Sequence, residues 1–292
     1  MREVFCEILQ RKLFLPEKCE RIVSFSPAIT EALFKIGLED KIKAVSTYCV
    51  RPKEARKKII IGSYSTFKKE KLDEIKPDLI FTTTGYQLDL ANKLLENYPV
   101  YAIRLPATIS DLIATCCEAG LVAGYFEEAR RLQKYLLTKL NEIINIKSSS
   151  KVITEEGKIS QQNNPTVYLE IDLGGPVTFG AYSYITDALN FIGFKNIFDK
   201  YCNEWLKPDD KYVKDISPDI IIYEPKMFSK KRNQKDIIDA LTKRFGEIKA
   251  IKYNNIFITP GIYDFLAHHG PSFINEVIPW LVSIKTKYTF SI

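Results

Sequence analysis

The chain contains the same two sequence segments twice, in the same order. The first segment is Thr30-Glu31-Ala32-Leu33 followed by Ile36-Gly37-Leu38, and its second copy is Thr186-Asp187-Ala188-Leu189 followed by Ile192-Gly193-Phe194. Apolar residues three and four positions apart indicate one buried helix face, and glycine suits the left-handed residue that ends many helices. Each copy therefore predicts the end of an amphipathic helix.

The second repeated segment carries a Pro-Asp pair. It runs from Ile75 to Phe81 in the first half and from Ile216 to Ile222 in the second. In both places the proline ends a helix, and the apolar run after it is typical of a strand that is buried on both faces. Two such helix-to-strand units predict an α/β protein with two lobes, each a mostly parallel sheet covered by helices.

The segment between the halves has a long helical pattern. From Ser110 to Lys147 apolar residues recur at helical spacing, and a helix rising ~1.5 Å per residue could cross from one lobe to the other as a stiff connector. We therefore predict an N-terminal lobe over 1–120, a connecting helix over 121–147, a polar insertion over 148–164 and a C-terminal lobe over 165–292.

Composition and the pattern of charges reduce the number of functions that the chain can have. The net charge is +6, but Lys and Arg are scattered among Asp and Glu, so we expect no nucleic-acid partner. Charges interrupt every apolar stretch of Met1–Ser24, and no window has the ~20 apolar residues of a membrane span. The sequence as written predicts a cytoplasmic monomer, and an extracytoplasmic, membrane-associated protein where a leader is missing.

Six cysteines occur without C-x-x-C or Cys/His spacing, so no zinc site is predicted. Unpaired thiols are the expectation. Cys6 and Cys19 would face each other across a predicted hairpin, which leaves a disulfide between these two open.

Residues that follow the predicted strands are the candidates for ligand binding, because ligands of open α/β sheets bind beyond the carboxyl ends of the strands. The chain has 16 Tyr and 17 Phe but only 2 His, so tyrosine is its main polar aromatic. In the first half the candidates are Ser26, Pro27, Tyr64, Ser65, Gly85 and Tyr86. Ser26 is also a good helix N-cap, with Pro27 suited to the first helical position.

The second half offers a similar set after its predicted strands. The candidates are Gly180, Tyr182, Tyr184, Tyr263, Asp264 and His268. Aromatic faces with a few hydroxyls suit a planar or bulky ligand. His268 and His269 are predicted on a helix, where neighbours point apart, so one metal would not take both.

Motifs of the common enzyme classes are missing from the sequence. There is no G-x-S-x-G, H-E-x-x-H, P-loop or G-x-G-x-x-G, and two adjacent histidines leave few candidates for a catalytic base. We predict a binding protein without catalysis, without a covalent cofactor and without direct metal ligands.

The stretch from Arg21 to Glu31, the Lys-Pro-Asp segment within 72–80 and the repeated helix ending resemble the substrate-binding proteins of cobalamin and ferric-siderophore ABC importers. The resemblance extends from about residue 8 to about residue 281 and is interrupted mainly by 147–164. It implies two Rossmann-like lobes joined by one long rigid helix, and a metal-containing organic ligand held between them with little hinge motion. It also implies that residues after Ser26-Pro27, with Tyr64 and aromatics near Tyr182, line the cleft.

The same resemblance implies docking to a permease through one glutamate on each lobe, six positions before the Lys-Pro or Ser-Pro of the repeat. Glu70 has this position in the first lobe, whereas the second lobe has Lys211 there and Asp210 beside it. A lysine would repel a basic docking partner that a glutamate attracts.

Three functions remain open at this point. The first is the ligand-binding component of an importer of corrinoids or iron chelates, with Asp210 in place of the expected glutamate. The second is a cytosolic protein that holds or transfers a corrinoid, haem or iron chelate. The third is a chelatase-like enzyme on a tetrapyrrole, with His268 and Glu224 in the cleft.

Overall fold

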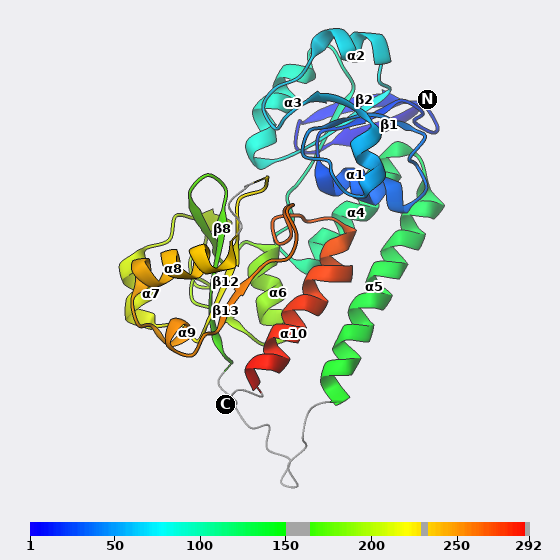
Figure 1. Ribbon diagram of the computed structural model, residues 1–292. Helices are drawn as coiled ribbons and strands as arrows, with labels where there is room; N and C mark the ends of the chain where they lie inside the picture. The colour runs from blue at the N-terminus through cyan, green and yellow to red at the C-terminus, as the bar shows by residue number, and fades with distance from the viewer. Residues whose placement is uncertain (150–163, 229–232, 290–292) are drawn as a thin grey trace. The chain divides into compact units, whose positions relative to one another are not determined.

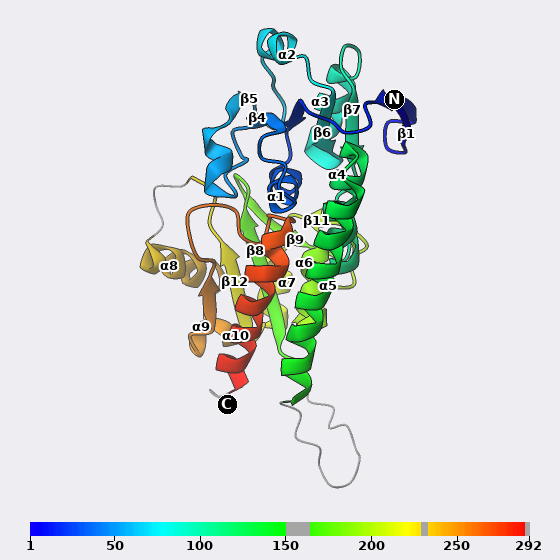
Figure 2. The same ribbon diagram turned by 90° about the vertical axis from the view of Figure 1, so that its right-hand side faces the viewer.

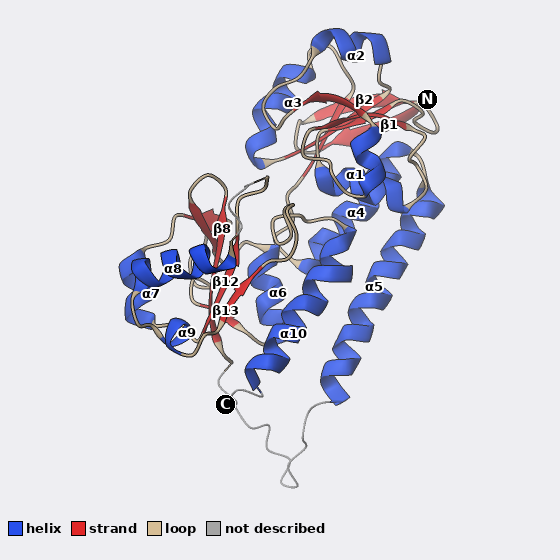
Figure 3. Ribbon diagram, in the orientation of Figure 1, coloured by secondary structure: helices blue, strands red, loops and turns tan. Residues whose placement is uncertain are grey.

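The computed structural model describes residues 1–149, 164–228 and 233–289, which form two compact units. Unit 1 consists of Met1–Pro106, Ser110–Lys139 and His269–Pro271. Unit 2 consists of Ala107–Ile109, Leu140–His268 and Ser272–Ile292. Both units combine helices with a sheet that is mostly or wholly parallel, which confirms the predicted α/β class (Figure 3). The expected insertion over 148–164 lies almost wholly outside the described residues.

Unit 1 contains a five-stranded parallel sheet with the order β5-β4-β3-β6-β7. Its strands are β3 (Ile22–Ser24), β4 (Ile42–Ser46), β5 (Ile59–Gly62), β6 (Leu79–Thr83) and β7 (Val100–Ile103). Its helices are α1 (Pro27–Lys35), α2 (Lys69–Ile75), α3 (Leu88–Leu94), α4 (Ile109–Ala123) and the first part of α5 (Phe126–Ser149), with short 3₁₀ turns at η1 (Lys53–Lys57) and η2 (Gly85–Gln87).

Alternate residues of these strands pack into two separate cores, one on each face of the sheet. Ile22 and Phe81 belong to the core that includes residues of α1 and α4. Val23 and Ile80, their immediate neighbours in sequence, belong to the core that includes residues of α2 and α3 (Figure 1). Successive strand side chains point to opposite faces, which explains why the strands read as continuous apolar runs.

A β-hairpin of β1 (Arg2–Cys6) and β2 (Arg11–Leu15) precedes this sheet. Leu13 and Leu15 are buried in the core on the α1 side of the sheet. Cys6 and Cys19 are both buried as free thiols, which confirms the expectation of unpaired thiols and closes the alternative of a disulfide between them. The Cys6 thiol instead lies 3.7 Å from the Ala102 carbonyl oxygen as a weak hydrogen-bond donor.

Unit 2 has a sheet with the order β11-β9-β8-β12-β13, and β10 pairs with β8. Its strands are β8 (Thr166–Asp172), β9 (Pro176–Phe179), β10 (Lys195–Asn196), β11 (Trp205–Leu206), β12 (Ile220–Glu224) and β13 (Ile256–Ile258). Strands β8, β10, β12 and β13 are parallel, whereas β9 and β11 are antiparallel to their neighbours.

The helices of unit 2 cover both faces of this sheet. They are α6 (Tyr184–Ile192), α7 (Asp210–Ile216), α8 (Gln234–Phe245), α9 (Lys249–Lys252) and α10 (Ile278–Thr289), which follows a π-helical turn over Phe273–Val277. Residues of α7, α8 and α9 share one core with Tyr168 and Ile221 of the sheet. Figure 1 shows α6 and α10 on the opposite face.

The repeated sequence segments form the same structure in each unit. Helices α1 and α6 are followed by Gly37 and Gly193, whose φ angles of 81° and 80° are left-handed. Helices α2 and α7 end at Lys76 and Ser217, which are also left-handed with φ of 50°. These findings confirm the two predicted helix endings, in which the carbonyl groups of the last turn are satisfied by a left-handed residue.

The aspartate of each Pro-Asp pair anchors the neighbouring strand. Asp78 accepts hydrogen bonds from the backbone N–H groups of Glu20 and Arg21, just before β3. Asp219 accepts from the backbone N–H and the hydroxyl of Thr166, the first residue of β8. The repeat therefore preserves a contact between strands as well as the order of the elements.

The helical pattern predicted over 110–147 forms two helices, α4 and α5, with a break at Gly124. Gly124 has φ of 91°, and a Cβ there would lie 2.0 Å from the Glu17 carbonyl oxygen, so only glycine fits. Among the described residues, no helix is both long and apolar enough to cross a membrane.

Candidate functional site

Two tyrosines stack at the carboxyl ends of neighbouring strands in unit 1. Tyr48 follows β4 and Tyr64 follows β5, and their rings lie 4.2 Å apart with an interplanar angle of 12°. Both side chains are half-buried, and Ser65 next to them is exposed. A stacked pair of this kind has a broad flat face with hydroxyl groups at its edge, which suits a large ring system.

The loop after β6 presents a third tyrosine. Gly85 has φ of 72°, which places the exposed Tyr86 on a tight turn. The buried amide of Gln87 fixes this turn, because its oxygen accepts from the Thr83 N–H at 2.9 Å and its nitrogen donates to the Phe25 carbonyl at 2.9 Å. Tyr86 therefore extends from a loop with a rigid base.

Ser26 and Pro27 form the start of α1, as the sequence predicts. The Ser26 hydroxyl accepts from the Ile29 N–H at 3.4 Å, and Pro27 occupies the first helical position. Ser26 is buried and its carbonyl accepts from the Thr30 hydroxyl at 2.9 Å. These contacts give Ser26 and Pro27 a role at the start of the helix. Contact of the two residues with a ligand stays a prediction.

Unit 2 also has an aromatic pair at the carboxyl ends of neighbouring strands. Phe228 follows β12 and Tyr263 follows β13, and their rings meet edge to face at 5.8 Å. The backbone N–H of Phe228 donates to the Ile262 carbonyl at 3.4 Å, which links the two loops. Phe228 is half exposed, at 50%.

Glu224 holds the loop after β13 from the end of β12. Its buried carboxylate accepts from the N–H groups of Phe265 at 3.1 Å, Leu266 at 2.5 Å and Ala267 at 3.4 Å. Burial and, to a smaller extent, the charge of Asp264 raise the pKa of Glu224 to about 7, although the three N–H groups act in the opposite direction. The carboxylate oxygens face the protein backbone.

The backbone conformation around His268 differs from the prediction. His268 and His269 lie in an irregular segment before the last helices, so the predicted helix at this position is wrong. The Glu224 carboxylate explains the loop conformation. It accepts hydrogen bonds from backbone N–H groups that in a helix would point along the helix axis. His268 is buried, and among the described residues no group of three or more His, Cys, Asp or Glu side chains could hold a metal ion.

The expected placement of 178–184 at the carboxyl end of β8 is also wrong. After the turn at Asp172–Gly175, β9 runs back antiparallel to β8, so Gly180 and the tyrosines after it follow the returning strand. Gly180 approaches the loop at Tyr201 closely, since a Cβ there would lie 2.4 Å from its carbonyl oxygen. Their role in binding stays a prediction.

The two tyrosines after Gly180 differ in exposure. Tyr182 is 57% exposed. Tyr184 is buried, donates its hydroxyl to the Leu266 carbonyl at 2.8 Å and meets the Phe273 ring edge to face. Tyr182 is therefore the one of the two whose ring lies on the surface of unit 2.

The first turns of α2 and α7 carry the predicted docking residues. Glu70 in the first turn of α2 is exposed, and so is Lys211 in the first turn of α7. Asp210, beside Lys211, forms two hydrogen bonds with Arg244 of α8, at 2.6 and 2.9 Å, and Arg244 holds the pKa of Asp210 below its usual value.

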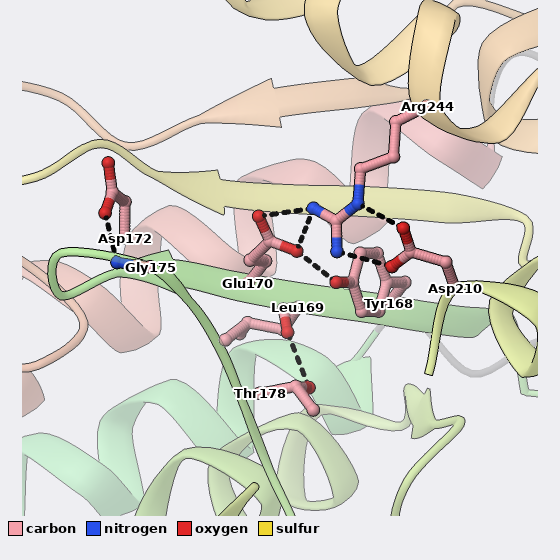
Figure 4. Close-up of polar contacts among 8 residues, drawn as sticks. All are labelled: Tyr168, Leu169, Glu170, Asp172, Gly175, Thr178, Asp210 and Arg244. Carbon is pink, nitrogen blue, oxygen red and sulfur yellow. Dashed lines mark hydrogen bonds and ion pairs between the residues drawn. The ribbon is translucent and has the colours of Figure 1, made fainter. Parts of the chain in front are cut away.

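Arg244 also contacts a second carboxylate, which is buried in unit 2. Its Nη1 atom lies 2.9 and 2.7 Å from the two carboxylate oxygens of Glu170, which also accepts from the Tyr168 hydroxyl (Figure 4). Burial raises the pKa of Glu170 despite the guanidinium beside it. One guanidinium thus joins two carboxylates, and the charge of Asp210 is balanced within unit 2.

Comparison with known proteins identifies the family. The family model described as "Periplasmic binding protein" matches residues 22–263. The chain belongs to the periplasmic binding protein family. The vitamin B12-binding protein of Yersinia pestis (strain Pestoides F) is 39% identical over 213 residues, which are 72% of this chain and 71% of that protein. The uncharacterized ABC transporter substrate-binding lipoprotein YvrC of Bacillus subtilis (strain 168) is 26% identical over 267 residues, 88% of this chain and 77% of that protein.

Solved structures of this periplasmic binding protein fold align along most of the chain. The vitamin B12 binding protein BtuF of Vibrio cholerae has a TM-score of 0.73 at 16% identity, with 93% of this chain and 98% of that chain covered. The heme-binding protein RhuT from Roseiflexus sp. RS-1 also has a TM-score of 0.73, at 17% identity, with 92% and 99% covered. At these identities the likeness shows the fold alone.

Two residues of the aromatic pairs were missed by reasoning from the sequence. Tyr48 comes two positions after β4 and Phe228 four positions after β12. Both obey the rule that ligands of parallel sheets bind near the carboxyl ends of strands. A uniform search of every strand end would have found Tyr48 and Phe228 in this periplasmic binding protein.

Proposed function

We propose that the chain is the substrate-binding component of an ABC importer and that it binds a metal-containing organic ligand of the vitamin B12, haem or iron-chelate class. Membership of the periplasmic binding protein family supports this role, as do the relatives described as a vitamin B12-binding protein and an ABC transporter substrate-binding lipoprotein. The same relatives support a permease partner and action outside the cytoplasm.

Within this class we propose a corrinoid as the ligand. The observation that supports it best is the stacked Tyr48–Tyr64 pair, which combines a wide aromatic face with hydroxyl groups. The Phe228–Tyr263 pair gives unit 2 a comparable aromatic surface after two neighbouring parallel strands. Corrinoids are bulky rings with polar edges, and aromatic side chains supply contact area to such ligands at a small cost in side-chain entropy.

The proposed ligand contacts differ in how strongly the structure supports them. Tyr64, Tyr86 and Tyr263 follow parallel strands, and none of the three is buried. Ser65, Gly85, Gly180, Tyr182, Asp264 and His268 remain proposed contacts of lower rank, and Ser26, Pro27, Tyr184 and Glu224 rank last because the contacts within the protein already account for them.

We propose that binding is not followed by catalysis. The chelatase alternative relied on Glu224 and His268, and both side chains are buried. Glu224 in addition accepts three backbone N–H groups, and a base for metal insertion would need an oxygen that reaches the substrate.

The test is a binding titration of the purified full chain with cyanocobalamin, cobinamide, haem, a ferric hydroxamate and a ferric catecholate. Isothermal titration is preferable to intrinsic fluorescence, because both tryptophans, Trp205 and Trp280, belong to unit 2. We expect a dissociation constant in the nanomolar to micromolar range for a corrinoid and much weaker binding of the iron chelates.

Substitution of the aromatic pair identifies the site. We expect Tyr48→Ala with Tyr64→Ala to weaken binding on the order of 30-fold, as removal of aromatic contacts at the centre of an interface commonly does. Tyr253→Ala is the matched control, because Tyr253 is an exposed tyrosine that precedes β13 and so lies at its amino end. Equal affinity of the double variant and the wild type would exclude the tyrosine pair, and turnover of any ligand would contradict the proposed function.

Location separates the importer from the cytosolic alternative. We expect the natural gene product to fractionate outside the cytoplasm and to co-purify with a permease and an ATPase after mild cross-linking. Recovery of the ligand-loaded protein from the cytosol alone would favour a holding or transfer protein.

A further inference from the structure

A run of positive charge lies between β4 and β5 in unit 1. Residues 51–58 read Arg-Pro-Lys-Glu-Ala-Arg-Lys-Lys, in which Glu54 is the single acidic residue among five basic ones. Most of this run forms the 3₁₀ turn η1, and its buried residue is Ala55. One small side chain anchors the turn, and the long basic side chains of Lys53, Arg56 and Lys57 are exposed.

The lysines of this run have two different environments. Lys53 and Lys57 are exposed, as is Lys35 at the end of α1. Lys58 is tied to the protein, because its Nζ atom donates to the Glu39 carbonyl at 2.6 Å and lies 5.8 Å from the centre of the Phe34 ring. The exposed lysines and Lys58 thus surround the end of α1.

A hollow of about 490 Å³ lies among these side chains. Its lining includes Phe34, Lys35, Lys57 and Lys58, together with the acidic residues Glu39 and Glu54. None of the proposed ligand-binding residues lines this hollow, so it is separate from the aromatic pair of the same unit.

Exposed apolar residues follow directly after the charged run. Ile59 and Ile60 are 48% and 37% exposed, and they begin β5, the edge strand of the unit 1 sheet (Figure 2). Large aliphatic side chains on an edge strand are a liability unless something covers them. Ile59 and Ile60 follow Lys57 and Lys58 directly in the chain and point to opposite faces of the edge strand, so apolar side chains border the basic run at this edge of the sheet.

We propose that Lys35, Lys53, Lys57, Ile59 and Ile60 form a membrane-docking surface that binds anionic phospholipid. Six basic residues, Lys35, Arg51, Lys53, Arg56, Lys57 and Lys58, outnumber the nearby acidic residues Glu39, Asp40 and Glu54, which leaves a net charge of +3. Lysines attract lipid phosphates over a Debye length, while isoleucines beside them enter the boundary between headgroups and acyl chains. This surface has a function beyond ligand binding and does not depend on it.

A membrane fits these observations better than an acidic protein does. Three of the four exposed cations of this region are lysines, Lys35, Lys53 and Lys57, and the fourth is Arg56. Lysines act as mobile point charges and suit a fluid layer of phosphates. The surface also combines an excess of cations with isoleucines at an open edge, and the hollow beside it is lined by lysines that could follow a headgroup.

The test is co-sedimentation of the full chain with vesicles of phosphatidylcholine alone or of phosphatidylcholine with phosphatidylglycerol. We expect binding to the anionic vesicles only, with weaker binding at higher salt. Lys35→Gln with Lys53→Gln and Lys57→Gln should reduce the partition coefficient about fivefold per lysine, on the order of a hundredfold together. The control is Lys195→Gln with Lys235→Gln and Lys243→Gln, three exposed lysines of unit 2 whose loss changes net charge equally.

A second variant tests how much the isoleucine side chains contribute to vesicle binding. Ile59→Ser with Ile60→Ser should weaken vesicle binding severalfold even at high salt, where attraction between charges is screened. Circular dichroism spectra and thermal melts verify that each variant is folded. The proposal is overturned if the wild type does not bind anionic vesicles, or if it binds neutral vesicles as strongly as anionic ones. It is also overturned if the Lys35, Lys53 and Lys57 variant binds anionic vesicles as strongly as the unit 2 control does. Binding to acidic proteins without binding to vesicles also overturns it.

Discussion

Unit 1 and unit 2 share a framework but anchor the loops that follow their Pro-Asp strands, β6 and β12, with different chemistry. In unit 1 the neutral amide of Gln87 fixes the turn after β6 through Thr83 and Phe25. In unit 2 the carboxylate of Glu224, at the end of β12, holds three backbone N–H groups. The same helix and strand scaffold thus accepts either a neutral or an ionisable anchor, and only the ionisable anchor makes stability depend on pH.

The helices before β6 and β12 show a second difference. In α2 of unit 1, Lys69 and Asp73 form an exposed ion pair at 2.8 Å, which contributes little. In α7 of unit 2, Asp210 belongs to a network that reaches through Arg244 to the buried Glu170. Unit 2 is therefore expected to depend on ion pairing far more than unit 1.

The largest expected effect comes from Arg244→Met. Removal of the guanidinium leaves the Glu170 carboxylate buried without its cation, and loss of one partner from a buried pair typically costs about 3–5 kcal/mol. Denaturant unfolding followed by tryptophan fluorescence measures this, because both tryptophans report on unit 2. Lys69→Met is the matched control in unit 1, where circular dichroism should show a far smaller loss of stability because both partners of the ion pair are exposed. Equal losses for the two variants would contradict the comparison.

The next effect is a pH dependence that belongs to unit 2. The pKa of Glu224 rises from 4.5 to about 7 on folding, so between these values the folded state binds more protons than the unfolded chain. Stability of unit 2 therefore falls as pH rises through this range, by on the order of 3 kcal/mol for this group.

Glu224→Gln isolates this contribution. We expect the difference in unfolding free energy between wild type and variant to change with pH in this window and to become constant above about pH 7. Gln87→Glu is the reverse change in unit 1 and should introduce a similar decrease with rising pH. A constant difference for Glu224→Gln at every pH would show that Glu224 titrates as an ordinary carboxyl group.

Substitution of the two strand-anchoring aspartates should have equal effects in the two units. Asp78→Ala and Asp219→Ala each remove a carboxylate that accepts backbone hydrogen bonds, with an expected loss of about 1.5–3 kcal/mol. Circular dichroism detects the first and tryptophan fluorescence the second. The Asn variants keep one acceptor oxygen and should lose less. A large loss at only one of the two sites would mean that the repeat conserves sequence without conserving this contact.

The smallest predicted effect concerns the two glycines that end α1 and α6. Gly37→Ala and Gly193→Ala force a Cβ onto a left-handed residue, at a cost of about 1 kcal/mol each. Thermal melts of the two variants provide the measurement, with Gly175→Ala as a control at an exposed position where an added Cβ meets nothing within 4 Å. Loss at one glycine only would show that one unit tolerates the strain.

The structure places some of the predicted site residues at the carboxyl ends of strands and others elsewhere, and the reason is geometrical. Tyr64, Tyr86 and Tyr263 follow parallel strands, so the rule about carboxyl ends found them. Tyr182 and Tyr184 were placed by the same rule at the end of β8, but β9 returns antiparallel and takes them elsewhere. A short apolar run such as 176–179 does not reveal in the sequence whether it continues, turns back or leaves the sheet.

Local features of this protein were determined by the sequence alone. The repeated helix endings, the Pro-Asp strands and the helix start at Ser26 follow from backbone preferences of glycine, proline and serine over a few residues, which act before any tertiary contact forms. The repeat itself was enough to predict two units of one class.

Only the tertiary structure determined which partners the polar and aromatic side chains contact. The stacking of Tyr48 on Tyr64, the link from Asp210 through Arg244 to Glu170 and the loop held by Glu224 join residues from different elements. Hydrogen bonds and ring contacts of this kind depend on distances that only the folded chain sets, and burial then shifts the pKa of Glu170 and Glu224 in ways that no local pattern encodes.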